Sequence, residues 1–82
     1  MNANQKAQLG LATIKEAILE ILEEHRGGLK NSEIADMLGL RSDYLGGQKD
    51  YLTWSVLGLL LNDHIIQRKD RRYILAKYLQ KD

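Results

Sequence analysis

Residues 65–75, IIQRKDRRYIL, decide the fold class of this 82-residue chain. Two short runs with strand character, Ile65–Arg68 and Arg72–Leu75, flank the polar connection Lys69–Arg71. This pattern predicts a β-hairpin, because β-branched and aromatic residues favour strands and polar residues favour the turn between them. After the hairpin, residues 76–81 are expected to form one final helical turn.

The chain before the hairpin has helical periodicity. Apolar residues recur at helical spacing between Ile14 and Leu22, which predicts a first amphipathic helix. Thr13 and Glu16 have the spacing of a capping box and place the helix start at Thr13. The alternative is that Leu9 and Leu11 extend the helix backwards, against which Gly10 counts. Gly27-Gly28 ends the helix, since glycine adopts the left-handed conformation without a steric cost.

Two further helices follow. A short one begins at Asn31 or Ser32 and stops at Gly39, and Leu29-Lys30 before it forms a very short strand. Asp50 caps a third helix that runs to about Asn62 and is apolar nearly all round. Residues 40–49 between them are interpreted as a loop with one helical turn. The prediction is an α+β, mainly α fold with a domain over residues 13–82 and a polar N-terminal extension over residues 1–12.

Length and composition exclude several functional classes. The chain is long enough for one core only, and without cysteine it has no disulfide, thiolate chemistry or cysteine-based zinc site. The polar start lacks the apolar region of a signal peptide. The longest apolar run, residues 56–61, is far shorter than the roughly 20 residues of a membrane span. We therefore expect a cytoplasmic protein with no membrane partner. The formal net charge of +1 does not by itself indicate nucleic acid.

Three segments together resemble a known superfamily. The pattern of a second helix and turn occurs in residues 32–40, SEIADMLGL. The third helix ends within residues 59–66, LLLNDHII, and a basic hairpin ends with Arg72-Tyr73-Ile74-Leu75. In this order they resemble the winged helix-turn-helix DNA-binding superfamily, over about residues 13–75. The resemblance implies that the third helix enters the major groove and that the hairpin, the wing, contacts the backbone or minor groove. The chain departs from the usual pattern by inserting residues 43–49 before the third helix.

Clustered positive charge on the hairpin is the strongest functional signal. From His64 to Lys77 there are five basic residues and one acid, Asp70, a net charge of +4. Such a cluster binds phosphates by releasing their counterions, and arginine matches phosphate oxygens in a bidentate geometry. The alternative is an ordinary solvated hairpin tip. The residues expected to contact DNA here are Arg68, Lys69, Arg71 and Arg72.

A second polar cluster precedes the third helix and continues onto it. Its tyrosine and glutamine side chains can donate to phosphates or base edges, and its cations add to the charge. The stripe Tyr51, Ser55, Gly58 and Asn62 faces the groove in this interpretation, and solvent or a packing partner in the alternative. Gly46-Gly47 forms either an anion-binding nest or a simple turn. The residues expected to contact DNA in this cluster are Arg41, Ser42, Tyr44, Gln48, Lys49, Tyr51 and Ser55.

The remaining conspicuous residues have simpler interpretations. Trp54 is predicted to lie in the core or at its edge, and the alternative is a stacking platform for a base. His25 is expected to complement the C-terminus of the first helix. His64 follows Asp63, but two histidines without cysteine make a poor metal site. No metal, cofactor or catalytic residue is predicted. The glutamates of the first helix, Glu16, Glu20, Glu23 and Glu24, are expected to form a solvated face.

These observations predict a non-enzymatic domain that binds double-stranded DNA. It would act as a transcriptional regulator or as the DNA-docking module of a DNA-processing system. The alternative is a protein-interaction or dimerisation module on the same fold, because the leucines of the third helix, with Tyr78 and Leu79, give more apolar surface than a small core needs. Homodimerisation would reconcile the two, since winged-helix dimers read paired half-sites.

Overall fold

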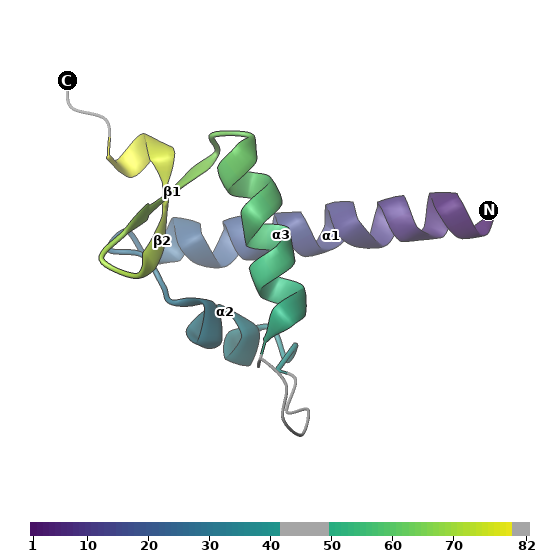
Figure 1. The fold of residues 1–82 in the computed structure, drawn as a ribbon, viewed down its shortest axis with the longest axis horizontal. Helices are drawn as coiled ribbons and strands as arrows, with labels where there is room; N and C mark the ends of the chain where they lie inside the picture. Colours follow the sequence, from purple (N-terminus) through teal and green to yellow (C-terminus); the bar gives the residue numbers. More distant parts are fainter. Residues whose placement is uncertain (42–49, 80–82) are drawn as a thin grey trace.

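The computed structural model describes residues 1–41 and 50–79 of the chain. These residues form an α+β, mainly helical fold with three helices and a two-stranded antiparallel hairpin, as predicted. Helix α3 (Tyr51–Asn62) crosses α1 (Ala3–Glu24), and the short α2 (Asn31–Met37) packs beside the start of α3 (Figure 1). The hairpin, β1 (Ile66–Lys69) and β2 (Arg72–Leu75), lies near the C-terminal end of α1 and is followed by the 3₁₀ turn η1 (Ala76–Tyr78).

Each element contributes apolar side chains to one core. Complete burial of an aliphatic side chain stabilises a fold by about 1.5–3 kcal/mol, so these contacts fix how the helices and the hairpin are arranged. No helix within the described ranges has both the length and the apolar composition needed to cross a membrane. The buried members of the core cluster are Ile18, Leu22, Leu29, Ile34, Val56, Leu57, Leu60, Ile66, Tyr73 and Leu75.

Helix α1 begins ten residues earlier than predicted. Asn2 caps it: its side chain accepts a hydrogen bond from the Gln5 backbone N–H (2.8 Å), and Gln5 Oε1 accepts one from the Asn2 N–H (3.0 Å). The prediction of a helix start at Thr13 is therefore wrong, and the Thr13 hydroxyl instead donates to the Leu9 carbonyl within the helix (2.8 Å). Alanine, glutamine and lysine are strong helix formers, which offsets the cost of about 1 kcal/mol for Gly10. Residues 1–10 are exposed, and this part of α1 extends past α3 (Figure 1).

A backbone bridge joins the α1–α2 connection to the hairpin. The Leu29 N–H donates to the Tyr73 carbonyl (3.1 Å), and the Tyr73 N–H donates to the Leu29 carbonyl (2.8 Å). The very short strand predicted at Leu29 is thus confirmed as a single bridge. Gly28 before it has a φ of 86°, as expected of a glycine that redirects the chain after a helix.

The α2–α3 region follows the predicted boundaries closely. Helix α2 starts at Asn31, and Gly39, with a φ of 68°, follows it, as the glycine pattern predicted. Asp50 precedes α3 as predicted, but its carboxylate does not cap the helix. Its carbonyl oxygen instead accepts from the Trp54 N–H (3.2 Å). Of the loop predicted over residues 40–49, residues 42–49 lie outside the described residues.

The predicted hairpin is confirmed with a two-residue turn. Ile66 pairs with Leu75 and Lys69 with Arg72, which leaves Asp70 and Arg71 as the central residues of the turn. Both have positive φ, 51° and 67°. A turn with two such residues matches the right-handed twist of the strands and usually contains glycine or asparagine.

Candidate functional site

The hairpin turn and the α1–α2 connection together surround a hollow of about 580 Å³. We call it the basic hollow, because five of its lining residues are cationic and one is acidic. Two of the cations come from the helix connection and three from the hairpin, so the hollow combines segments more than 35 residues apart in sequence. Its lining residues are Arg26, Gly27, Lys30, Lys69, Asp70, Arg71, Arg72, Ile74 and Leu79.

The Leu29–Tyr73 bridge explains why these cations converge. It fixes the α1–α2 connection against β2, so that Arg26 and Lys30 flank the basic hairpin. The approach is close: a Cβ atom added to Gly28 would lie 2.4 Å from Ile74 Cγ1 and 2.8 Å from the Tyr73 carbonyl oxygen. Only glycine at position 28 therefore allows this backbone arrangement.

Sequence reasoning found the hairpin cations but missed Arg26 and Lys30. The sequence did contain a signal for these two residues, namely the short strand predicted at Leu29. A strand needs a partner, and the other predicted strands are those of the hairpin. Pairing these strands would have placed the residues around Leu29 beside the basic turn.

The four predicted hairpin cations are not all in one place. Lys69, Arg71 and Arg72 line the basic hollow and are exposed. Arg68 is also exposed, but it is not one of the hollow's lining residues. Its guanidinium carbon lies 5.4 Å from the centroid of the Tyr73 ring, a cation–π contact that restrains the side chain.

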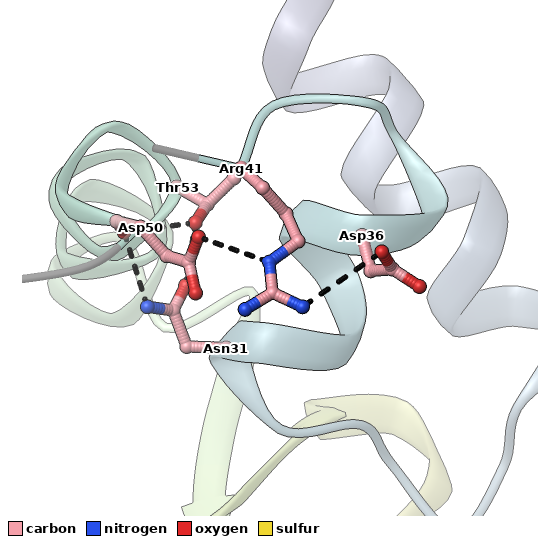
Figure 2. A network of polar contacts seen from close by, with 5 residues as sticks. All are labelled: Asn31, Asp36, Arg41, Asp50 and Thr53. Carbon is pink, nitrogen blue, oxygen red and sulfur yellow. Dashed lines mark hydrogen bonds and ion pairs between the residues drawn. The ribbon is translucent and has the colours of Figure 1, made fainter. Parts of the chain in front are cut away.

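Arg41 belongs to a polar network between α2 and α3 (Figure 2). Its guanidinium lies 3.9 Å from a carboxylate oxygen of Asp36 and 3.9 Å from one of Asp50. Asp50 is buried, and its carbonyl oxygen accepts from Asn31 Nδ2 (3.1 Å). The buried Thr53 hydroxyl lies 2.7 Å from Asn31 Oδ1 and 3.0 Å from the Asp50 carbonyl oxygen. Arg41 thus lies between two carboxylates at the junction of α2 and α3, apart from the basic hollow.

Helix α3 exposes part of the predicted DNA-contacting set. Tyr51 and Ser55 are exposed, as are the other members of the predicted stripe, Gly58 and Asn62. The predicted residues Ser42, Tyr44, Gln48 and Lys49 lie outside the described residues, as does Gly46-Gly47.

Trp54 is not in the core, and the prediction that placed it there is wrong. It is 52% exposed, and its ring lies 5.4 Å from that of Tyr51. The physical reason is the position of the buried face, which carries Thr53, Val56, Leu57 and Leu60 at helical spacing. Thr53 can occupy the core because its hydroxyl is hydrogen-bonded, and this turns the neighbouring Trp54 outward.

Glu23 joins α1 to the C-terminal turn and is more than part of a solvated face. Its carboxylate pairs with Lys77 and accepts a hydrogen bond from the Tyr78 hydroxyl (2.8 Å), which also lies 3.0 Å from the Glu23 carbonyl oxygen. Bonding to Lys77, and secondarily to Tyr78, lowers the pKa of Glu23. The same contacts raise the pKa values of Lys77 and Tyr78. Glu16, Glu20 and Glu24 are exposed, as predicted.

The histidines occupy unremarkable positions. His25 follows the last residue of α1, as predicted, and its Nδ1 lies 2.7 Å from the Ile21 carbonyl oxygen. His64 is exposed. Within residues 1–41 and 50–79, no three histidine, aspartate or glutamate side chains are grouped in a way that could hold a metal ion.

The arrangement of the basic hollow is suited to bind an anion with several negatively charged oxygens. Its cations approach from two sides, the hairpin and the helix connection, and three of the five are arginines. No family model, curated protein or solved structure matches this chain, so the geometry and chemistry of the hollow carry the functional argument alone.

Proposed function

We propose that this domain is a winged helix-turn-helix module that binds duplex DNA and has no enzymatic activity of its own. In this proposal α2 and α3 are the helix-turn-helix and the β1–β2 hairpin is the wing. The single bridge between Leu29 and Tyr73 supports the assignment, because it attaches the segment between α1 and α2 to the β1–β2 hairpin. The role would be transcriptional regulation or DNA docking, in the cytoplasm.

The basic hollow is the observation that carries this proposal. Arg26, Lys30, Lys69, Arg71 and Arg72 line one surface with a single acid, Asp70. A phosphate backbone binds such a surface because each neutralised phosphate releases condensed counterions. Five phosphate contacts would make log K fall with log salt at a slope of about −4.5, taking roughly 0.9 per contact.

Arg71 adds support through its backbone conformation. Its φ of 67° is a conformation that glycine adopts freely and that costs other L-residues about 1–2 kcal/mol. Residues held in such conformations often occur at functional sites. Arg71 is exposed at the tip of the hairpin and is one of the cations that line the basic hollow.

The exposed face of α3 is the part that would enter the major groove. Tyr51 and Ser55 can hydrogen-bond to bases or phosphates, but α3 has no lysine or arginine. The commonest sequence-specific contact, arginine or lysine to guanine, is therefore unavailable to this helix. We expect binding in which phosphate contacts dominate and sequence discrimination is small.

Fluorescence anisotropy of a mixed-sequence duplex at several salt concentrations tests the proposal. Wild type should bind with a slope near −4.5, and Arg71→Glu/Arg72→Glu should bind far more weakly. Lys6→Glu/Lys15→Glu is the matched control, because it makes the same change in net charge on α1, outside the hollow. A slope near zero for wild type, or equal loss in both variants, would show that the hollow does not bind DNA.

A second candidate function is protein interaction, with homodimerisation as its simplest form. The observation that favours it is the exposed apolar surface of α3, where Leu52 is 47%, Trp54 52% and Leu59 42% exposed. Exposed aromatic and aliphatic side chains of this kind are typical of contact sites between proteins. Sedimentation equilibrium at increasing concentration tests it: wild type should self-associate and Trp54→Ser/Leu59→Ser should not. A monomer at all concentrations would refute homodimerisation.

A further inference from the structure

The C-terminal turn contacts one of the cations of the basic hollow. The Arg26 guanidinium carbon lies 4.9 Å from the centroid of the Tyr78 ring, and Leu79 next to Tyr78 is itself part of the lining of the hollow. A guanidinium within about 6 Å of an aromatic face is attracted to it. Arg26 is exposed, and the contact with this ring restricts its side chain.

The Tyr78 ring is itself fixed to α1. Its hydroxyl donates to Glu23, with the carboxylate oxygen at 2.8 Å and the backbone carbonyl oxygen at 3.0 Å. Glu23 lies in the last turn of α1 and Arg26 two residues after its end, so the contacts run from α1 through Tyr78 to the start of the α1–α2 connection. Because Glu23 and Arg26 are only three residues apart, a ring bonded to Glu23 holds a defined position relative to Arg26.

Lys77 completes this arrangement electrostatically. It pairs with the Glu23 carboxylate, and its Nζ lies 5.3 Å from the centroid of the Tyr78 ring. An unpaired carboxylate at position 23 would attract the Arg26 guanidinium and reduce the positive charge that faces the hollow. Lys77 is the stronger partner of this carboxylate and Arg26 the weaker one, so the charge of Arg26 remains available for an anion.

We infer that Tyr78 and Glu23 are positioning residues for Arg26, which makes the C-terminal turn part of the DNA-binding surface. This inference rests on the proposed function, since it assigns Arg26 a phosphate contact. Ordering one long side chain before binding removes an entropic cost of association, and the corresponding gain in affinity is about two- to twelvefold.

A double-mutant cycle on duplex affinity separates positioning from a general structural role. Tyr78→Leu should weaken binding about two- to twelvefold and leave the salt slope unchanged, because Arg26 can still reach a phosphate. Arg26→Ala should reduce the slope by roughly 0.9. In the Arg26→Ala background, Tyr78→Leu should have no further effect. Tyr78→Phe provides a milder variant, because it removes the hydroxyl bond to Glu23 and keeps the ring and the net charge, and its smaller loss should also vanish in that background.

Side-chain NMR of free protein provides the independent readout. The Arg26 Nε–Hε resonance should be shifted and ordered in wild type, and Tyr78→Leu should move it to the position of a free arginine. The inference alone is overturned if wild type binds DNA but the Tyr78 and Arg26 effects are additive. Wild type without salt-dependent binding overturns the proposed function as well, so the two failures are distinguishable.

Discussion

Replacing Gly28 by alanine should strongly destabilise the domain, although it adds only one methyl group. Gly28 has a φ of 86°, and a Cβ atom there would meet Ile74 Cγ1 at 2.4 Å and the Tyr73 carbonyl oxygen at 2.8 Å. The Ile74 side chain can rotate, but the Tyr73 carbonyl is fixed by its hydrogen bond from Leu29. The substitution therefore forces the α1–α2 connection away from β2.

The expected magnitude has two parts. A left-handed backbone costs an L-residue about 1–2 kcal/mol relative to glycine, and an extra methyl group in a closely packed site costs about 1–3 kcal/mol. Together they give a loss of about 2–5 kcal/mol. A domain of 82 residues has a total stability of about 4–12 kcal/mol, so this loss is a large fraction of the whole.

Urea denaturation followed by circular dichroism measures this effect, with Gly27→Ala as the matched control. An added Cβ at Gly27 meets no atom of the described structure within 4 Å, and its φ is not positive. Gly27→Ala should therefore change the free energy of unfolding by less than about 1 kcal/mol. If Gly28→Ala is as stable as Gly27→Ala, the close approach of residue 28 to β2 is wrong, and the geometry of the basic hollow is wrong with it.

Three further predictions concern the polar contacts and α3. Thr53→Val should lower the free energy of unfolding by about 1–3 kcal/mol, because it removes a buried hydroxyl that bonds to Asn31; Thr53→Ser in the same urea titration should retain most of the stability. Trp54→Ala should lower the free energy of unfolding by less than about 1.5 kcal/mol, well below the 3–5 kcal/mol typical of a buried tryptophan, because Trp54 is exposed. A larger loss of stability in a thermal melt would place Trp54 in the core. The pKa of Glu23 in the folded protein is lower than its ordinary value of 4.5. The stability that the ionised Glu23 carboxylate contributes is therefore present above pH 4.5 and is lost as the pH falls through the lowered pKa. Glu23→Gln should therefore be less stable than wild type at pH 7, and urea titrations near pH 3 should show a smaller difference.

The elements of the fold could be predicted from the sequence because their signals are local. The hairpin follows from strand-forming residues on either side of a polar turn, and the turns after α1 and α2 follow from Gly28 and Gly39. The start of α1 could not be predicted in this way. A search for an apolar stripe overlooks residues 3–12, whose helix is stabilised by propensity and by the Asn2 cap rather than by burial.

The site was only partly predictable because it depends on tertiary pairing. Lys69, Arg71 and Arg72 are adjacent in sequence, so their cluster is visible without a structure. Arg26 and Lys30 join them only through the bridge between Leu29 and Tyr73. Arg41 has the opposite outcome: sequence identifies it as one more available cation, but the structure places Asp36 and Asp50 beside it.

The contrast between Arg41 and Arg26 shows why net charge is a poor guide to what this domain binds. The formal total is +1, but a phosphate is affected mainly by charges within a Debye length, about 8 Å at physiological salt. Within that distance, Arg41 is offset by two carboxylates, whereas Arg26 faces an aromatic ring and shares the basic hollow with four other cations. Glu23, whose carboxylate also interacts with Arg26, has Lys77 as its stronger partner. The contacts of each cation, more than the number of cations, therefore decide where on this surface an anion would bind.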